Sequence, residues 1–151
     1  TQLLPLMNQQ GRVVNLSSAA QSSVEIDALI GKVDNLADMA AYAQSKLAIT
    51  MWSRAMGLSD APNMPAIIAV NPGSLLGSKM VKEGFGIAGK SLKIGADILV
   101  RAALSDEFSE VSGQYYDNDS KQFSAAHEDA LNPEKCQQVI AAMEDTLSKI
   151  S

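Results

Sequence analysis

Two short β-branched runs, separated by a segment of helical pattern, constrain the fold more than any other feature of this chain. The runs are RVVNL (12–16) and AIIAV (66–70), and the helical pattern extends from about residue 38 to residue 58. Short apolar runs bounded by turn residues are typical of buried strands. A strand, a helix and a strand at this spacing predict a parallel βαβ unit. The sequence therefore predicts an α/β fold built on a parallel sheet.

The residues that follow both strands are expected to meet at one edge of the sheet. Ser17 and Ser18 follow the first run, and Pro72 and Gly73 come soon after the second. Ligands of open α/β sheets bind at the carboxyl ends of the strands. The predicted helix of residues 38–58 begins near the same edge, because it follows the loop that leaves it. We therefore expect a ligand site formed by these segments.

Tyr42 and Lys46 lie four residues apart in this predicted helix, within AYAQSKLAIT. Side chains at this spacing are stacked neighbours. A tyrosine hydroxyl has an ordinary pKa of about 10, and an ammonium group one turn away favours the ionised phenol. A serine hydroxyl on the same rim can hydrogen-bond the carbonyl oxygen that the tyrosine protonates. These groups suit carbonyl reduction or alcohol oxidation beside a hydride donor, although the spacing alone also fits an ordinary surface helix.

Three motifs occur in order along the chain: GRVVNLSS, AYAQSKLA and IIAVNPG. Together they resemble the short-chain dehydrogenase/reductase family. AYAQSKLA and the tail SGQYYDNDSKQFSAAHEDALNPE are most similar to its retinol-dehydrogenase-like branch. The resemblance spans nearly the whole chain. It implies an NAD(P)-dependent oxidoreductase acting on a small-molecule carbonyl or secondary alcohol.

The resemblance also implies the C-terminal half of a Rossmann-like doubly wound parallel sheet with flanking helices. The family's glycine-rich turn, its first four strands and its active-site asparagine would all precede Thr1. We therefore expect residues 1–151 to be a single partial domain whose N-terminal cofactor-binding half is absent. Such a chain would be inactive alone and could not distinguish NAD from NADP.

The resemblance assigns a role to each residue that matches a motif. Ser18, rather than Ser17, would polarise the substrate oxygen. Tyr42 would be the general acid or base, and Lys46 would assist it and hold the cofactor ribose. The implied cofactor-binding residues are Tyr42, Lys46, Pro72, Gly73, Leu75 and Ser78. The family usually has threonine where this chain has Gly77, and we expect the neighbouring Ser78 to substitute for it.

Composition argues against several other classes of protein. The net charge is −5 and no basic stripe is present, so nucleic-acid binding is not expected. No apolar run is long enough to span a membrane and no signal-peptide pattern is present, so we expect a cytoplasmic protein. Cys136 is the only cysteine, which rules out an intramolecular disulfide and a cysteine-cluster metal site. No metal site is expected.

Two alternative functions remain open. The predicted helix has one apolar stripe at Leu47, Met51 and Leu58 and a second at Ile49, Trp52 and Met56. Two apolar faces indicate burial on two sides. The helix around residues 39–58 could therefore join copies of the chain, either in an oligomeric enzyme or in a non-catalytic oligomerising or binding fragment.

The second alternative is a P-loop nucleotide-binding protein, because GFGIAGKS (84–91) fits both the P-loop and the dinucleotide fingerprint. Both motifs need a strand directly before them. The preceding GSKMVKE has too few apolar residues for a buried strand. We expect instead a mobile loop that closes over the substrate, and substrate preference to depend on residues 19–41 and 75–94.

The remaining segments predict further elements. These are the end of a helix in TQLLPLM (1–7), a short helix through VEIDALI (24–30) with a capping box at Ser22 and Glu25, a helix over residues 97–105, a last strand QYYD (114–117), and a helix from Asn132-Pro133 to about Lys149. His127 is expected in a solvated loop.

Overall fold

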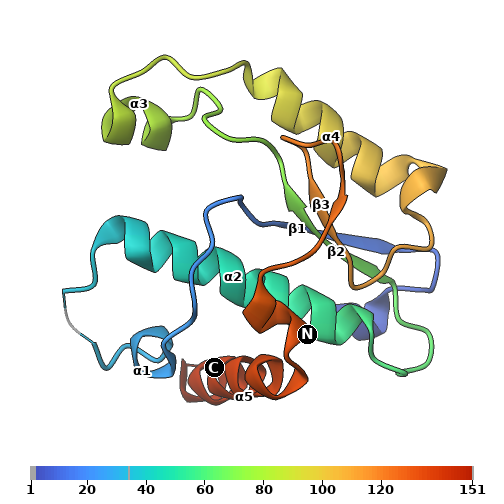
Figure 1. The fold of residues 1–151 in the computed structure, drawn as a ribbon. Helices are drawn as coiled ribbons and strands as arrows, with labels where there is room; N and C mark the ends of the chain where they lie inside the picture. The colour runs from blue at the N-terminus through green and yellow to red at the C-terminus, as the bar shows by residue number, and fades with distance from the viewer. Residues whose placement is uncertain (1–2, 34, 151) are drawn as a thin grey trace.

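The computed structural model describes residues 3–33 and 35–150 and has a mixed α/β fold (Figure 1). Within these residues, one open sheet has the strand order β1-β2-β3-β4, with β1 Arg12–Leu16, β2 Ala66–Asn71, β3 Tyr115–Asp117 and β4 Gln122–Ser124. β1, β2 and β3 are parallel, and β4 pairs antiparallel with β3. The predicted α/β class of Rossmann-like type is confirmed.

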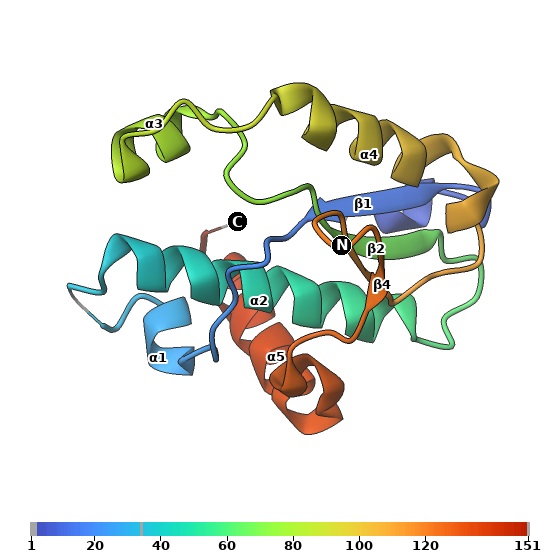
Figure 2. The ribbon, with the colours of Figure 1, turned by 45° about the horizontal axis from the view of Figure 1, so that its top comes forward.

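The helices cover both faces of this sheet. The α-helices are α1 Ile26–Leu29, α2 Asp38–Gly57, α3 Lys79–Phe85, α4 Leu92–Leu104 and α5 Pro133–Ile150, and short 3-10 turns span Leu4–Leu6, Asp106–Phe108 and Glu128–Leu131. α2 lies on one face with α5 packed beyond it, and α4 lies over the other face (Figure 2). The connection from β1 to β2 contains the short α1 and the long α2, and α2 is the helix that the βαβ prediction requires.

Two apolar clusters hold these layers together. One joins α2 to α5 and the preceding turn, through Leu47, Ala48, Met51, Ala130, Cys136 and Val139. The other joins the sheet to α4, through Ile68, Val70, Ile98, Ala102, Phe108 and Tyr116. Because β2 is covered on both faces, its successive side chains are all buried from Ile67 onward. This burial explains why its sequence reads as a continuous apolar run.

The two predicted stripes of α2 are only partly buried. Leu47 and Met51 are fully buried, as expected. Leu58 is 56% exposed, and its assignment to the same stripe is wrong. The helix ends at Gly57, so helical periodicity no longer sets the direction of the next side chain. The residues of the second stripe are half-buried, which leaves the oligomer prediction untested.

Several predicted boundaries are corrected by the structure. α4 begins at Leu92, five residues before the predicted start, because Ser91 caps it by accepting a hydrogen bond from the Lys93 amide. The predicted capping box is wrong: α1 starts after Glu25 without a side-chain cap. The start of α5 is confirmed, since Asn132 Oδ1 accepts hydrogen bonds from the first-turn amides.

The ends of the chain and β4 complete the comparison. Residues 4–6 form a 3-10 turn with proline in its first positions, whereas residues 1–2 of the predicted helix end lie outside the described residues. β3 begins at Tyr115, one residue later than predicted, and β4 was not predicted. Among the described helices, none is both long enough and apolar enough to cross a bilayer.

Candidate active site

A cavity of about 290 Å³ lies at the carboxyl edge of the sheet. Its walls come from the end of β1, the start of α2, and the segment from the β2–α3 loop to the start of α4. All the predicted site residues except Lys46 line it: Ser18, Tyr42, Pro72, Gly73, Leu75 and Ser78. The parallel register of β1 and β2 brings their carboxyl ends to the same edge. Residues far apart in the sequence thus meet as predicted.

Ser18 is held by its backbone and faces the cavity. Its carbonyl accepts hydrogen bonds from Gln21 Nε2 (2.8 Å) and from the Tyr115 hydroxyl (3.1 Å). Its own Oγ accepts a hydrogen bond from the Ala20 amide (3.1 Å). These contacts use the Ser18 hydroxyl only as an acceptor, so its proton can be donated to a ligand in the cavity.

Ser17 has a structural role instead. Its side chain is 3% exposed, and its hydroxyl lies 2.7 Å from Thr50 Oγ1 and donates to the Lys46 carbonyl (3.1 Å). Both partners belong to α2. Ser17 therefore fastens the end of β1 to the helix that carries Tyr42, and Ser18 is the serine that reaches the cavity.

Tyr42 and Lys46 have the neighbouring arrangement that their spacing predicts. Lys46 Nζ lies 5.5 Å from the centroid of the Tyr42 ring, within the range of a cation–π contact. The same ammonium donates a hydrogen bond to the Leu16 carbonyl at the end of β1 (2.9 Å). The hydrogen bond to Leu16 thereby holds the Lys46 ammonium over the Tyr42 ring.

The β2–α3 loop has an unusual backbone. Gly73 has φ +123°, a conformation that side chains rarely allow, and Leu75 has φ +55°. The Leu75 carbonyl accepts a hydrogen bond from the Lys90 amide (2.7 Å). Ser78 caps α3, because its Oγ accepts from the Val81 amide (3.3 Å). Ser78 lines the cavity, and this contact uses its hydroxyl only as an acceptor.

Gly77 lies at a point of the loop where there is no space for a side chain. A Cβ atom at Gly77 would lie 2.7 Å from the Ala88 carbonyl oxygen and 3.2 Å from that of Lys90. A Cβ atom at Gly89 would in turn lie 2.6 Å from the Gly77 Cα. The loop and the segment 86–90 therefore run backbone against backbone, and no side chain fits between them.

This packing also bears on the P-loop alternative. Residues 79–85, which contain Gly84, are helical and so do not provide the strand that either nucleotide motif needs. Lys90 is the lysine that matches the P-loop motif. Its Nζ forms an ion pair with Asp119 Oδ1 at 3.7 Å. The segment 86–90 packs against the β2–α3 loop that lines the cavity. It lacks the geometry of a phosphate-binding loop.

Tyr115, Asn71 and Asp119 surround the site and were missed by sequence reasoning. Burial, reinforced by the charge of Asp117, raises the pKa of Tyr115 to about 12, so its hydroxyl stays a hydrogen-bond donor. Asn71 is 1% exposed and donates to the carboxylates of Asp117 (2.7 Å) and Asp119 (2.9 Å). The only signal was their position along the strands: Asn71 ends β2, Tyr115 begins β3, and Asp119 lies in the turn after β3.

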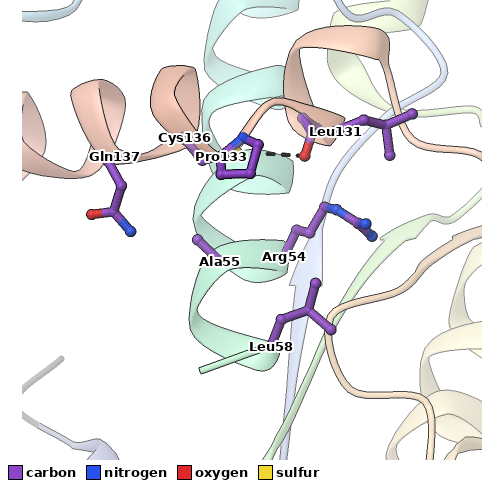
Figure 3. A pocket seen from close by; sticks show the side chains of 8 residues that line it. Arg54, Ala55, Leu58, Leu131, Pro133, Cys136 and Gln137 are labelled. Carbon is purple, nitrogen blue, oxygen red and sulfur yellow. Dashed lines mark hydrogen bonds between the residues drawn. The ribbon is translucent and has the colours of Figure 1, made fainter. Parts of the chain in front are cut away.

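A second cavity, of about 240 Å³, lies between the end of α2 and the start of α5 (Figure 3). Arg54 reaches it from α2 and Leu58 from the position just after α2, and Pro133 and Cys136 reach it from α5. Burial raises the pKa of the Cys136 thiol, which is 3% exposed, so the thiol stays protonated. This cavity has no paired acid and base and is a weaker candidate for catalysis.

His127 and the possible metal ligands among the described residues are further candidate functional groups. His127 Nδ1 accepts a hydrogen bond from the Asp129 amide (3.2 Å) and caps the 3-10 turn at residues 128–131, so its placement in a plain solvated loop is corrected. No group of three or more histidine, cysteine, aspartate or glutamate side chains within the described part of the chain could hold a metal ion.

The fold and the cavity define a Rossmann-like α/β protein with polar groups at the carboxyl edge of its sheet. No protein-family model and no curated protein matches the chain. Among solved structures it is similar to the crystal structure of an uncharacterized protein from Mycobacterium paratuberculosis, with a TM-score of 0.68 and 19% identity. The match covers 89% of this chain and 49% of the Mycobacterium protein, so this chain spans about half the length of that protein. This likeness supports the fold alone.

Proposed function

We propose that this chain carries the catalytic residues of an NAD(P)-dependent oxidoreductase of the short-chain dehydrogenase/reductase type. Its reaction is hydride transfer between nicotinamide and a carbonyl or secondary alcohol. One observation carries the proposal: Ser18 and Tyr42 line the same cavity, and the Lys46 ammonium lies 5.5 Å from the Tyr42 ring. The cavity is at the edge where ligands of such sheets bind.

The cavity fits the nicotinamide end of such a cofactor. Pro72 and Leu76 give it apolar walls, and Gly73 has no side chain to obstruct a flat ring. Ser18 and Tyr42, which each carry a hydroxyl, line the same space. An uncharged ring beside a carbonyl needs this combination of apolar walls and a few donors. A bound NADH or NADPH would supply the hydride.

The residues of the chain then perform the proton chemistry. The Ser18 hydroxyl donates a hydrogen bond to the carbonyl oxygen and stabilises its developing negative charge. The Tyr42 hydroxyl gives its proton to that oxygen in reduction and recovers it in oxidation. Lys46 stabilises the resulting phenolate through its nearby positive charge. Its hydrogen bond to the Leu16 carbonyl keeps the ammonium in place throughout.

A non-catalytic oligomerising fragment is the second candidate. It is supported by the half-buried Ile49, Trp52 and Met56 on α2, which could pack against another copy. Oligomerisation through α2 is also compatible with an enzyme. Turnover therefore separates the two candidates, whereas the oligomeric state does not.

The test is cofactor-linked turnover by the natural protein, measured with NADH and NADPH against a panel of ketones and aldehydes. We expect Tyr42→Phe to reduce turnover about 100-fold or more, the usual contribution of a general acid, while dinucleotide binding is kept. Tyr116→Phe is the matched control, because it removes a buried hydroxyl that contacts Arg101. Retained turnover in Tyr42→Phe would defeat the assignment.

A further inference from the structure

The β2–α3 loop needs an external support to keep the shape that lines the cavity. Leu75 has φ +55°, in the left-handed region that is unfavourable for a residue with a side chain. Gly73, two residues earlier, also has positive φ. Such backbone persists only when surrounding contacts determine it. Two segments supply such contacts: the Lys90 amide donates to the Leu75 carbonyl (2.7 Å), and the turn between β3 and β4 holds the residues before Leu75.

Asp119 in that turn contacts the loop at Ser74. Its carboxylate accepts hydrogen bonds from the Ser74 amide, at 3.0 Å to each oxygen, and from Ser74 Oγ at 2.5 Å. It also accepts from Asn71 Nδ2 at 2.9 Å, and Lys90 Nζ lies 3.7 Å away. Hydrogen bonds to a charged acceptor are stronger than neutral ones. The residue directly before Leu75 is therefore held at both its amide and its side chain.

Asn118 and Asn71, which lie next to Asp119, make further hydrogen bonds with the β2–α3 loop. Asn118 Nδ2 donates to the Pro72 carbonyl (2.9 Å), and the Gly73 amide donates to Asn71 Oδ1 (3.1 Å). Partial desolvation raises the pKa of Asp119, but the hydrogen bonds from Ser74 and Asn71 and the nearby Lys90 outweigh it and leave that pKa below its usual value. Asp119 is thus held as a carboxylate.

We propose that Asp119 is a positioning residue that holds the β2–α3 loop in the conformation lining the candidate active site. Asp119 does not itself line the cavity, whereas Ser74, Leu75 and Leu76 do. It acts on the wall formed by the β2–α3 loop and leaves the proton-transferring groups unchanged. The proposal rests on the proposed function for its effect on catalysis, but its effect on the loop is independent of that function.

Asp119→Asn tests this role with little change in shape. Both carboxylate oxygens accept the Ser74 amide, so either orientation of the new amide turns an NH2 group towards a donor. Asp145→Asn is the matched control, because it removes one charge from an exposed ion pair with Lys149 on α5. Ser74→Ala and Ser74→Thr form a second pair: only the first loses the hydroxyl that donates to Asp119.

The first readout is hydrogen exchange of the Ser74 amide, which needs no assumption about activity. We expect exchange to be about tenfold faster in Asp119→Asn and unchanged in Asp145→Asn, since the broken hydrogen bonds are charge-assisted. Ser74→Thr should exchange more slowly than Ser74→Ala. Unchanged exchange in Asp119→Asn would overturn the proposal whatever the protein catalyses.

The second readout is steady-state kinetics of the natural protein. If Asp119 positions the wall, Asp119→Asn should raise KM about tenfold and leave kcat within about twofold. Faster exchange with unchanged KM would overturn the positioning role and leave a merely structural one. If the unaltered protein shows no cofactor-linked turnover, the proposed function fails, and exchange alone decides whether Asp119 holds the loop.

Discussion

Gly77 lies where the β2–α3 loop passes closest to the segment 86–90, and a side chain there should force the two apart. We consider Gly77→Thr, which introduces the residue that the resembling family usually has. The new Cβ would lie 2.7 Å from the Ala88 carbonyl oxygen and 3.2 Å from that of Lys90. Both are backbone atoms, which cannot move aside as the end of a flexible side chain can.

The expected cost follows from the contacts that must open. Overpacking of this kind costs about 1–3 kcal/mol of unfolding free energy. Two backbone hydrogen bonds of 2.7 Å cross the same contact, from the Lys90 amide to Leu75 and from the Gly77 amide to Lys90. Each is worth about 1 kcal/mol, but the exposed segment can relax outward. We therefore expect a loss of about 2 kcal/mol, or roughly 4–8 °C in Tm for a chain of this size.

Urea unfolding and hydrogen exchange of the Gly77 and Lys90 amides measure both effects. Gly84→Thr is the matched control, because a Cβ atom there meets nothing within 4 Å. Threonine is also a better helix former than glycine, so this control should be neutral or slightly stabilising. Wild-type stability together with wild-type exchange in Gly77→Thr would refute the close approach of the two segments.

Three further predictions concern the fold and its titratable groups. Gly57→Ala should destabilise the protein by about 2 kcal/mol, because its Cβ would lie 2.7 Å from the Gly113 Cα. In an isolated helix the same change would be stabilising by up to about 1 kcal/mol. A higher urea midpoint than that of the unaltered protein would contradict this prediction. The pKa of Tyr115 is raised to about 12, so the unfolded state ionises first and stability should fall as pH rises from about 10 to 12. The stability of Tyr115→Phe should fall less steeply over this range. Equal slopes of urea midpoint against pH for the variant and the unaltered protein would oppose the interpretation. Burial and a raised pKa should keep Cys136 unreactive towards maleimide until the protein unfolds; rapid labelling of the folded protein would argue against its burial.

The parts of the fold that sequence predicted are those with a strong local pattern. β1, α2 and β2 have apolar runs or helical periodicity of sufficient length, and their order fixes the βαβ unit. The same order predicted that Ser18 and Pro72 would share one edge, because parallel strands point the same way. β4 was missed because it is short and only Phe123 in it is large and apolar. Its strand geometry comes from pairing with β3.

The supports of the site could not be predicted, because they depend on contacts between distant segments. Asp119 and Ser74 are 45 positions apart, and Gly77 meets Gly89 only after α3 has turned the chain. A leucine in the left-handed region, as at Leu75, has no sequence signature. The family resemblance and its cofactor stay predictions, since the structural neighbour at 19% identity supports the fold alone.

The most direct test of the central claim is transfer of deuterium from a reduced nicotinamide cofactor that carries deuterium at both hydrogen positions of C4. The natural protein would be incubated with this cofactor and a panel of carbonyl compounds, and the masses of the products would be measured by mass spectrometry. We predict one deuterium on the carbinol carbon of a product, and a loss of that product in Tyr42→Phe but not in Tyr116→Phe. Deuterium retained entirely in the cofactor across the panel, or equal transfer by Tyr42→Phe, would contradict the account.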